Sequence, residues 1–342
     1  MGKAEFKLAF RAPSTPPKSI PYKSKDGDPM QSETIFHVIK PGVLTTFQDM
    51  GRIGYQRFGV PVSGAMDRFS LQVANILVGN NRNTTCLEVT LIGPVLEART
   101  SITIAITGAN LQPKINDRLE PMWKTIRMNK GDVLTFGKHQ SGVRAYIAVG
   151  GGFDVETFFG SASTDVKNGF GMQLQKSTRI NAFPMDVKQG IGLGKQFIPI
   201  YEKLVEVAVV EGPHTANFTE EARELFFNSI HTVDADSNRM GYRLKSENIP
   251  LQNSSDIWSD AVPFGGIQIP GNGQPIILMA DRQTTGGYPR IGTVISADLP
   301  KIAQLMPKGE VKFYPVTVEE AQKLVIEMEN FLYKLDVFRK NF

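Results

Sequence analysis

The segment from Asp281 to Pro289 carries more hydrogen-bonding side chains than a plain turn requires. It lies between the apolar runs 275–280 and 291–295, so a simple hairpin closed by Gly286-Gly287 is one reading. Paired glycines also let the backbone approach a ligand closely, and Pro289 fixes the chain after Tyr288. Neutral donors and acceptors suit an amide or a lactam better than a phosphate. We therefore predict a cleft wall built from Asp281, Gln283, Thr284, Thr285, Gly286, Gly287 and Tyr288.

A second polar segment, Ser237-Asn-Arg-Met-Gly-Tyr-Arg243, places two guanidinium groups and a phenol around one glycine. Arg239 can hold a carboxylate or a phosphate through paired N–H groups, with Tyr242 as a further donor. A solvated turn between two strands explains the same residues equally well. If the segment is functional, we expect it to face residues 281–289 across the cleft.

A third segment joins Arg52 to Ser63 and Asp67 at the start of a predicted helix. The N–H groups at a helix N-terminus favour an anion, so these residues are candidates for substrate binding or catalysis. The simpler alternative is that Ser63 or Asp67 only caps the helix, and physical reasoning alone favours it.

These segments need a scaffold, and the sequence predicts a mainly β one with a few short helices. Runs rich in β-branched residues, such as 101–107, 132–136 and 143–149, are separated by glycine turns, which is typical of sandwiches and barrels. Helices are predicted over 67–78, from Thr219 onward, and after a capping box of Thr317 and Glu320. In the last helix we expect core packing by one apolar stripe: Ala321, Leu324, Val325, Met328, Phe331, Leu332 and Leu335.

Several common kinds of site are excluded by their missing motifs. The glycines of 190–194 lack Walker spacing, no dinucleotide fingerprint follows a strand, and no nucleophile elbow occurs. The four histidines are far apart in the chain, and Cys86 is the only cysteine. We therefore predict no metal site and no disulfide, which suits the cytoplasm.

Length and charge set the remaining limits. With 342 residues, the chain is expected to form about two domains, which we place at 31–198 and 199–342 as two packed subdomains. Most of the net charge of +4 falls in the proline-rich residues 1–30, interpreted as a disordered leader or an expression segment. The remaining chain has neither a basic patch nor a run of about 18 apolar residues, so neither nucleic acid nor membrane is an expected partner.

Five long motifs occur in an order that resembles the allophanate hydrolase subunit 2 family, over roughly residues 35 to 335. They are LTTFQDMGRIGYQRFGVPVSGAMDRFSLQVANILVGN, LEVTLIGPVLEA, ITGANL, SNRMGYRL and GGIQIPGNGQPIILMADRQTTGGYPRIGTVISADLP. The resemblance implies a cyclophilin-like β-barrel architecture. It also implies a partner similar to allophanate hydrolase subunit 1 (the 5-oxoprolinase B subunit), with the A subunit of that enzyme as a further candidate. No biotin-attachment motif occurs, so any biotin would be carried by another chain.

The activity that this resemblance implies is the ATP-dependent hydrolysis of 5-oxo-L-proline to L-glutamate by an assembly of several chains. In that reading Arg52 and Arg239 bind anionic groups, Tyr242 and Tyr288 donate hydrogen bonds, and Asp67 or Asp281 acts as a base or an orienting group. Gln283 completes the expected catalytic set, and ATP is used by the complex.

The chain departs from the family at Ala162, where an arginine is usual, and at Met172, where a Gly-Arg pair is usual. Two alternatives therefore stay open. One is a regulatory protein that antagonises an inhibitor of a histidine kinase. The other is a biotin-dependent carboxyltransferase that acts on urea or a related amide.

Overall fold

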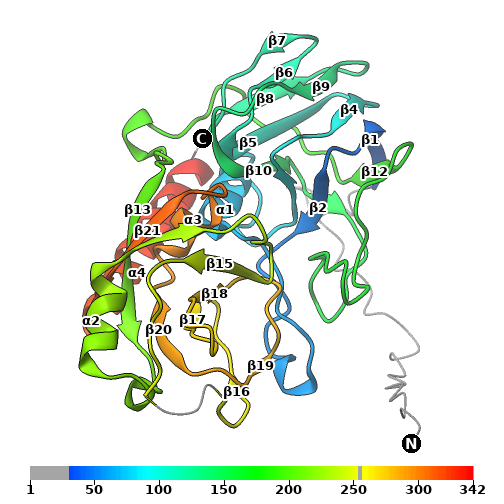
Figure 1. Cartoon of the computed structure of the whole chain (residues 1–342). Helices are drawn as coiled ribbons and strands as arrows, with labels where there is room; N and C mark the ends of the chain where they lie inside the picture. The colour runs from blue at the N-terminus through cyan, green and yellow to red at the C-terminus, as the bar shows by residue number, and fades with distance from the viewer. Residues whose placement is uncertain (1–30, 253–255, 342) are drawn as a thin grey trace, which may run out of the picture. The chain divides into compact units, whose positions relative to one another are not determined.

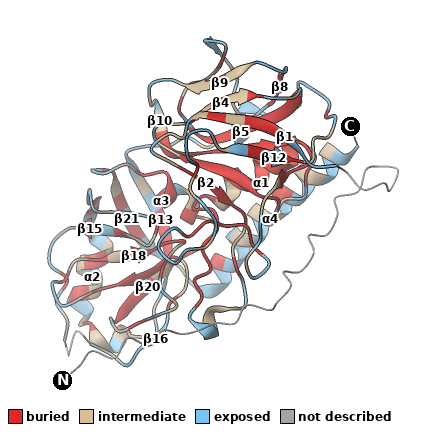
Figure 2. Ribbon diagram, turned by 90° about the vertical axis from the view of Figure 1, so that its right-hand side faces the viewer, coloured by how far each residue is buried: buried red, intermediate tan, exposed pale blue. Residues whose placement is uncertain are grey.

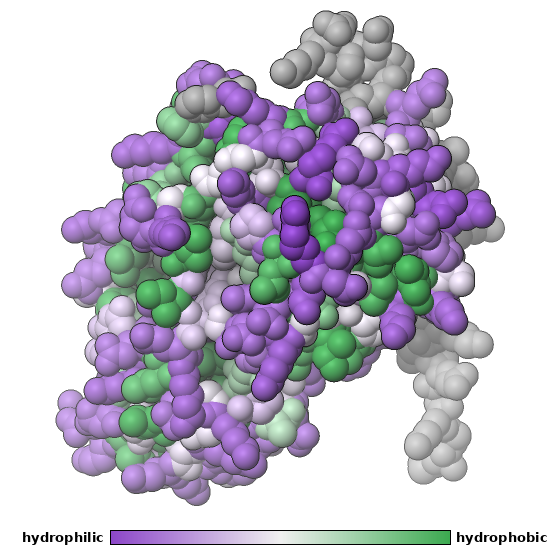
Figure 3. Space-filling model, turned by 90° about the horizontal axis from the view of Figure 1, so that it is seen from above, coloured by the Kyte–Doolittle hydropathy of each residue, from purple (hydrophilic) through white to green (hydrophobic). Residues whose placement is uncertain are grey.

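A computed structural model describes residues 31–252 and 256–341. The predicted leader, residues 1–30, lies outside the described residues. The described chain contains two antiparallel sheets followed by a closed barrel, and Figure 1 shows the sheets above the barrel strands. Seen from the side of the sheets, the surface is mostly hydrophilic, and hydrophobic side chains occur in small separate areas (Figure 3). Within the described ranges, no helix is long and apolar enough to cross a membrane.

The first half of the chain forms two sheets. The seven-stranded sheet consists, in spatial order, of β11 (Phe153–Asp154), β12 (Arg179–Ala182), β1 (Glu33–Lys40), β4 (Val95–Ala98), β9 (Val133–Phe136), β6 (Pro113–Ile115) and β7 (Arg118–Leu119). The five-stranded sheet consists of β2 (Leu44–Gln48), β3 (Cys86–Thr90), β10 (Ser141–Val149), β5 (Ile102–Asn110) and β8 (Thr125–Met128).

Strand β10 (Ser141–Val149) is apolar on both of its faces and contributes to two apolar clusters. Ala145, Ile147 and Val149 join the apolar cluster that both sheets share, whereas Tyr146 and Ala148 pack in the cluster that contains helix α1 (Arg68–Leu77). Successive side chains of a strand point to opposite faces, so a continuous apolar run is buried on both. Figure 2 shows the resulting buried centre of β5, β10 and α1. The N-terminus of this helix is buried, because its cap residue Asp67 is 1% exposed.

The second half forms a closed seven-stranded barrel. Its strands in order are β13 (Leu204–Glu211), β20 (Arg290–Val294), β17 (Gly266–Gln268), β18 (Ile276–Leu278), β15 (Gly241–Lys245), β14 (Ile230–Val233) and β21 (Glu310–Pro315). Helix α2 (Glu220–Asn228) packs on the barrel through Phe226, which stacks on Phe313 at 4.7 Å. A separate two-stranded sheet joins β16 (Asp260–Ala261) to β19 (Thr285–Gly286).

Two helices from the last part of the chain each contact α1 of the first half and β13 of the barrel. Helix α3 (Leu299–Ala303) precedes β21, and helix α4 (Val318–Lys340) contacts both α1 and β13. Three short 3-10 helices, η1 (Gln56–Phe58), η2 (Lys195–Phe197) and η3 (Thr215–Asn217), lie in connections. The predicted boundary at 198/199 falls between the last sheet strand and the first barrel strand, and the division into two domains stays a prediction.

The expectation of a mainly β protein with a barrel is confirmed, as are the three predicted helices. Thr317 and Glu320 form the predicted capping box. The apolar stripe of α4 is only partly core: Ala321 and Leu332 are buried, but Leu324 is 37% exposed, so the prediction is wrong at that position. A helix on the surface of a protein buries only the side that faces the core, so apolar residues at the edges of its stripe stay exposed.

Candidate functional site

A buried ion cluster joins the barrel to the five-stranded sheet. Arg239 lies just before β15 and donates to both carboxylate oxygens of Asp281, from Nε at 2.7 Å and from Nη2 at 2.9 Å. Its Nη1 donates to Glu88 on β3, and its Nη2 also donates to the main-chain oxygen of Gly64 at 2.8 Å. The bidentate geometry with Asp281 is the strong form of the arginine–carboxylate pair.

Glu88 is the centre of this cluster, being 1% exposed within an apolar strand. Burial alone would raise the pKa of Glu88, but the guanidinium groups of Arg239 and Arg144 outweigh it and lower that pKa. Burial alone would likewise lower the pKa of Arg239, and the carboxylates of Glu88 and Asp281 raise it instead. Glu88 also accepts hydrogen bonds from the Tyr146 hydroxyl at 2.7 Å and from Met66 N at 2.9 Å. Glu88 and Arg239 therefore stabilise each other's charged form.

Next to this cluster lies a cavity of about 250 Å³, here called the central cleft. Its lining comes from β2, from the segment 164–167, from the segment 238–240 and from the start of the 281–289 loop. The lining residues are Leu44, Thr46, Thr164, Asp165, Val166, Lys167, Asn238, Arg239, Met240 and Asp281. Both charge signs and several neutral donors thus meet around a space suited to a small polar molecule.

Arg52 lies near the cleft but is completely buried. Its Nη2 donates to the main-chain oxygen of Ser163, its Cζ lies 4.6 Å from the centroid of the Phe170 ring, and its Nε and Nη1 have no hydrogen-bond partner among the described residues. Burial lowers the pKa of Arg52, and the nearby carboxylates of Asp49 and Asp165 offset only part of that effect. Arg52 is therefore a guanidinium with spare donors in a dry environment.

Ser63 is buried beside the same segment and donates its hydroxyl to Asp165 Oδ2 at 3.3 Å. Its φ of 54° is in the left-handed region, which is uncommon for serine. Asp165 in turn accepts from the amide of Asn168 at 2.8 Å. Ser63 thus positions a carboxylate that lines the cleft.

The 281–289 loop is held through its backbone, the Asp281 carboxylate and the buried Arg282, and it presents other polar side chains outward. Val262 N donates to Thr284 O at 3.2 Å, and Ile257 N donates to Gly287 O at 2.8 Å. A Cβ at Gly286 would lie 2.6 Å from Gln268 Nε2, so the glycine makes room for a side chain of the protein itself. The side chains that point away from the core include Gln283, Thr285 and Tyr288, the last 41% exposed. Among the loop residues, Asp281 lines the central cleft.

Two predicted residues lie elsewhere in the buried interior. Asp67 caps α1, because its oxygens accept from Ser70 N at 2.9 Å and Ser70 Oγ at 2.6 Å, and it also accepts from Gln304 Nε2 at 2.8 Å. Burial raises the pKa of Asp67. The Tyr242 hydroxyl accepts from Arg144 Nη1 at 2.6 Å, inside the barrel. Neither residue lines the central cleft.

The predicted set is therefore divided among several places. The cleft brings together Arg239 and Asp281, with Arg52 and Ser63 near it. The sequence interpretation missed Glu88, Asp165 and Lys167; only Glu88 carries a signal, a carboxylate within the apolar run 86–90. Among the residues that the structure describes, no three His, Cys, Asp or Glu side chains gather as metal ligands do.

The two departures from the family pattern lie in another cavity, of about 290 Å³. Ala162 is buried and donates its N–H to Asp49 Oδ2 at 2.7 Å, while Met172 is 60% exposed. Arg179, from β12, also lines this cavity. The departures therefore change a neighbouring cavity and leave the residues of the central cleft in place.

Comparison with known proteins identifies similar carboxyltransferase domains and 5-oxoprolinase subunits. The family model for the carboxyltransferase domain, subdomain A and B, matches residues 58–315. The chain is 34% identical over 310 residues to the 5-oxoprolinase C subunit of Escherichia coli, covering 87% of this chain and 96% of that protein. It is 30% identical over 332 residues to the urea amidolyase of Saccharomyces cerevisiae, covering 89% of this chain and 18% of that protein.

A solved structure extends the similarity to three dimensions. The crystal structure of the K. lactis urea amidolyase matches with a TM-score of 0.84 and 31% sequence identity, covering 89% of this chain and 20% of that one. Matching sequence over most of the length together with a matching fold shows common family membership. The chain belongs to the carboxyltransferase domain family, in the part that comprises subdomains A and B.

Proposed function

We propose that this protein is the C subunit of an ATP-dependent 5-oxoprolinase, which hydrolyses 5-oxo-L-proline to L-glutamate together with partner chains. The observation that carries the proposal is the 34% identity to the 5-oxoprolinase C subunit over 96% of that relative, which leaves little of the relative unmatched. A protein similar to allophanate hydrolase subunit 1 (the 5-oxoprolinase B subunit) is the proposed partner, with the A subunit of the enzyme as a further one. The assembled complex would use ATP, in the cytoplasm.

The central cleft suits the chemistry of this substrate. 5-Oxoproline is small and carries one carboxylate and one lactam, so it needs a cation, an acceptor for the lactam N–H and donors for the lactam oxygen. Lys167 is exposed and lines the cleft, and its Nζ donates at 3.4 Å to Met240 Sδ, a weak acceptor. We assign the substrate carboxylate to Lys167 and the lactam to Thr46, Asn238 and Asp281.

In this assignment Arg239 is a positioning residue. Four of its five N–H donors are used by Asp281, Glu88 and Gly64, so it keeps the Asp281 carboxylate in place and has little left for a ligand. A lactam is stabilised by resonance, and ATP-dependent phosphorylation of its oxygen would activate it for attack by water. The chain would contribute substrate orientation and donors for the charge that develops.

Reconstitution tests the proposal. The isolated chain is expected to show no ATP hydrolysis that depends on 5-oxoproline, because its sequence has no Walker loop, and adding the A and B subunits is expected to restore it. The measurement is phosphate release with and without 5-oxoproline. Omitting only this chain from the mixture is the control, and full activity without it contradicts the proposal.

A second candidate function is biotin-dependent carboxyl transfer to urea or a related amide. The similarity to two urea amidolyases favours it. In that case, biotin carried by another chain would enter the cleft, and carboxylation of urea would require this protein.

A third candidate function is a regulatory role that antagonises an inhibitor of a histidine kinase. The departures at Ala162 and Met172 motivate it. Tight partner binding without any turnover would favour the regulatory role.

The exposed side chains of the 281–289 loop give a separate prediction. Neither Tyr288 nor Gln283 lines the central cleft, so we propose that both meet the substrate only when a partner chain covers this exposed face of the loop. Tyr288→Phe and Gln283→Ala are then each expected to cost about 1–3 kcal/mol of transition-state stabilisation, read from kcat/KM of the assembled complex. Melting temperatures should stay unchanged, because both side chains are exposed and the loop is held through its backbone. Tyr333→Phe, which alters an exposed tyrosine of α4, is the matched control. Full activity in both loop variants shows that the loop is only structural.

A further inference from the structure

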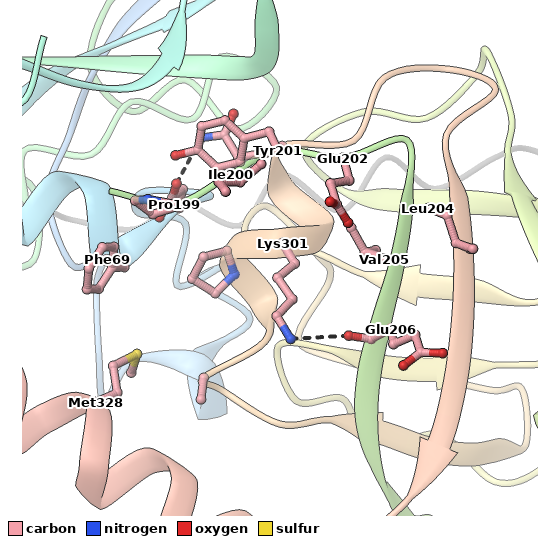
Figure 4. A pocket seen from close by; sticks show the side chains of 14 residues that line it. Phe69, Pro199, Ile200, Tyr201, Glu202, Leu204, Val205, Glu206, Lys301 and Met328 are labelled. Atoms are coloured by element: carbon pink, nitrogen blue, oxygen red, sulfur yellow. Dashed lines mark hydrogen bonds between the residues drawn. The ribbon is translucent and has the colours of Figure 1, made fainter. Parts of the chain in front are cut away.

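A cavity of about 630 Å³ lies beside α1, α3 and the start of β13, and it shares no lining residue with the central cleft. We call it the α1–α3 cavity. It is lined by Asp67, Phe69, Pro199, Ile200, Tyr201, Glu202, Leu204, Val205, Glu206, Ala297, Pro300, Lys301, Gln304 and Met328. Figure 4 shows Phe69 and Met328 on one side, the β13 residues on the other, and Lys301 between them. Its volume falls in the range of pockets that hold small organic molecules.

One wall of the cavity is aromatic and apolar. Phe69 lies on the first turn of α1, and its ring is 6.1 Å from that of Phe331 on α4 and 6.3 Å from that of Trp123. Met328, one turn earlier on α4, contributes a flexible thioether to the same wall. This wall can take an apolar body, and aromatic faces also attract cations.

The cavity wall also carries a buried carboxylate, two residues before Phe69 at the start of α1. Asp67 is 1% exposed and accepts three hydrogen bonds, one at Oδ1 and two at Oδ2. Oδ1 accepts only one of these, so it keeps capacity for one further donor. The Tyr201 hydroxyl lies 3.5 Å from Ser70 Oγ, a long contact that leaves this hydroxyl able to bond a ligand.

The charges around the cavity are predominantly negative. Glu202 and Glu206 are exposed at its rim, and the buried Asp67 also lines it. The one lining cation, Lys301, is already neutralised, because its Nζ lies 2.7 Å from Asp298 Oδ1 and donates to the Glu206 main-chain oxygen at 3.2 Å. Asp67 already caps the N-terminus of α1, so that helix end does not call for a further anion. The field inside therefore favours a positive group and disfavours a carboxylate.

From these contacts we infer that the α1–α3 cavity is a second ligand site, which binds a small amine with an apolar body. The ammonium group would lie toward Asp67, Tyr201 and the acidic rim, and the body against Phe69 and Met328. The site is distinct from the proposed 5-oxoproline cleft in place and in charge preference, so it does not depend on the proposed function.

Three probes of one shape test the charge preference. Isothermal titration of the full chain with 2-phenylethylamine, 2-phenylethanol and 3-phenylpropanoate is expected to rank them in that order. The amine should bind at least about tenfold more tightly than the carboxylate, because only the amine places a cation near the acidic groups and the aromatic wall. Equal affinities for the three probes, or no binding of the amine at millimolar concentration, overturn the inference.

Two variants locate the binding. Met328→Trp fills the cavity from α4 and leaves the Asp67 side chain unchanged, and Asp67→Asn removes the carboxylate while keeping a residue that caps helices well. Both are expected to weaken amine binding about tenfold or more, with the ratio of amine to alcohol affinity falling only in Asp67→Asn. Met172→Trp, at an exposed methionine outside the cavity, is the matched control. Unchanged amine binding in folded Met328→Trp contradicts the location.

Discussion

Replacing Arg239 with methionine is expected to lower the free energy of unfolding by about 3–5 kcal/mol. The substitution leaves Glu88 buried and charged, and it removes both donors from the Asp281 carboxylate. Arg144 remains 3.8 Å from Glu88, but a buried carboxylate that loses its nearer counter-charge costs far more than an exposed pair contributes. Such a loss is a large part of the roughly 5–15 kcal/mol that holds a typical protein folded.

The matched control for this variant is Arg243→Met, four residues further along the same segment. Arg243 is exposed, so its replacement should change the free energy of unfolding by less than about 0.5 kcal/mol. Urea unfolding followed by circular dichroism measures both. If Arg239→Met unfolds at the same urea concentration as the wild type, the ion cluster does not join the barrel to the sheet as described.

Replacing Arg52 with methionine should have the opposite signature, with stability kept and activity lost. Burial lowers the pKa of the Arg52 guanidinium despite the nearby Asp49 and Asp165, so the protein solvates this charge less well than water does. Its Nε and Nη1 have no hydrogen-bond partner among the described residues. An apolar residue of similar length should therefore cost less than about 1 kcal/mol of stability.

We expect the activity loss because Arg52, near the cleft, would stabilise the negative charge that develops on the substrate. Losing such a donor typically lowers kcat by about 100- to 1000-fold, which is the drop that we expect in the reconstituted complex. The control is Arg57→Met, which removes an exposed guanidinium lying 4.7 Å from the ring of Phe58. A folded Arg52→Met protein with full activity would falsify a functional role for Arg52, and a large loss of stability would make Arg52 a structural residue.

Local signals in the sequence were sufficient for several elements of this fold. Thr317 and Glu320 predict the start of α4, Asp67 predicts the start of α1, and both caps form as predicted, because a cap depends on residues three or four apart. The β-branched and apolar run of β10 similarly predicts a strand. Asp67 also shows the limit of local information. The sequence allowed either a helix cap or a functional residue at this position, and only the structure shows the cap.

The site itself was decided by the tertiary structure. Glu88 and Arg239 are separated by 151 positions, and Asp67 and Gln304 by 237, so no local pattern predicts either contact. Tyr242 and Arg239 share one motif, yet the pairing of Tyr242 with Ile277 turns the phenol into the barrel, toward Arg144, while Arg239 lines the cleft. Which of two neighbouring polar residues faces a ligand depends on strand register and on the charges brought in from distant segments, and both arise only when the sheets and the barrel close together.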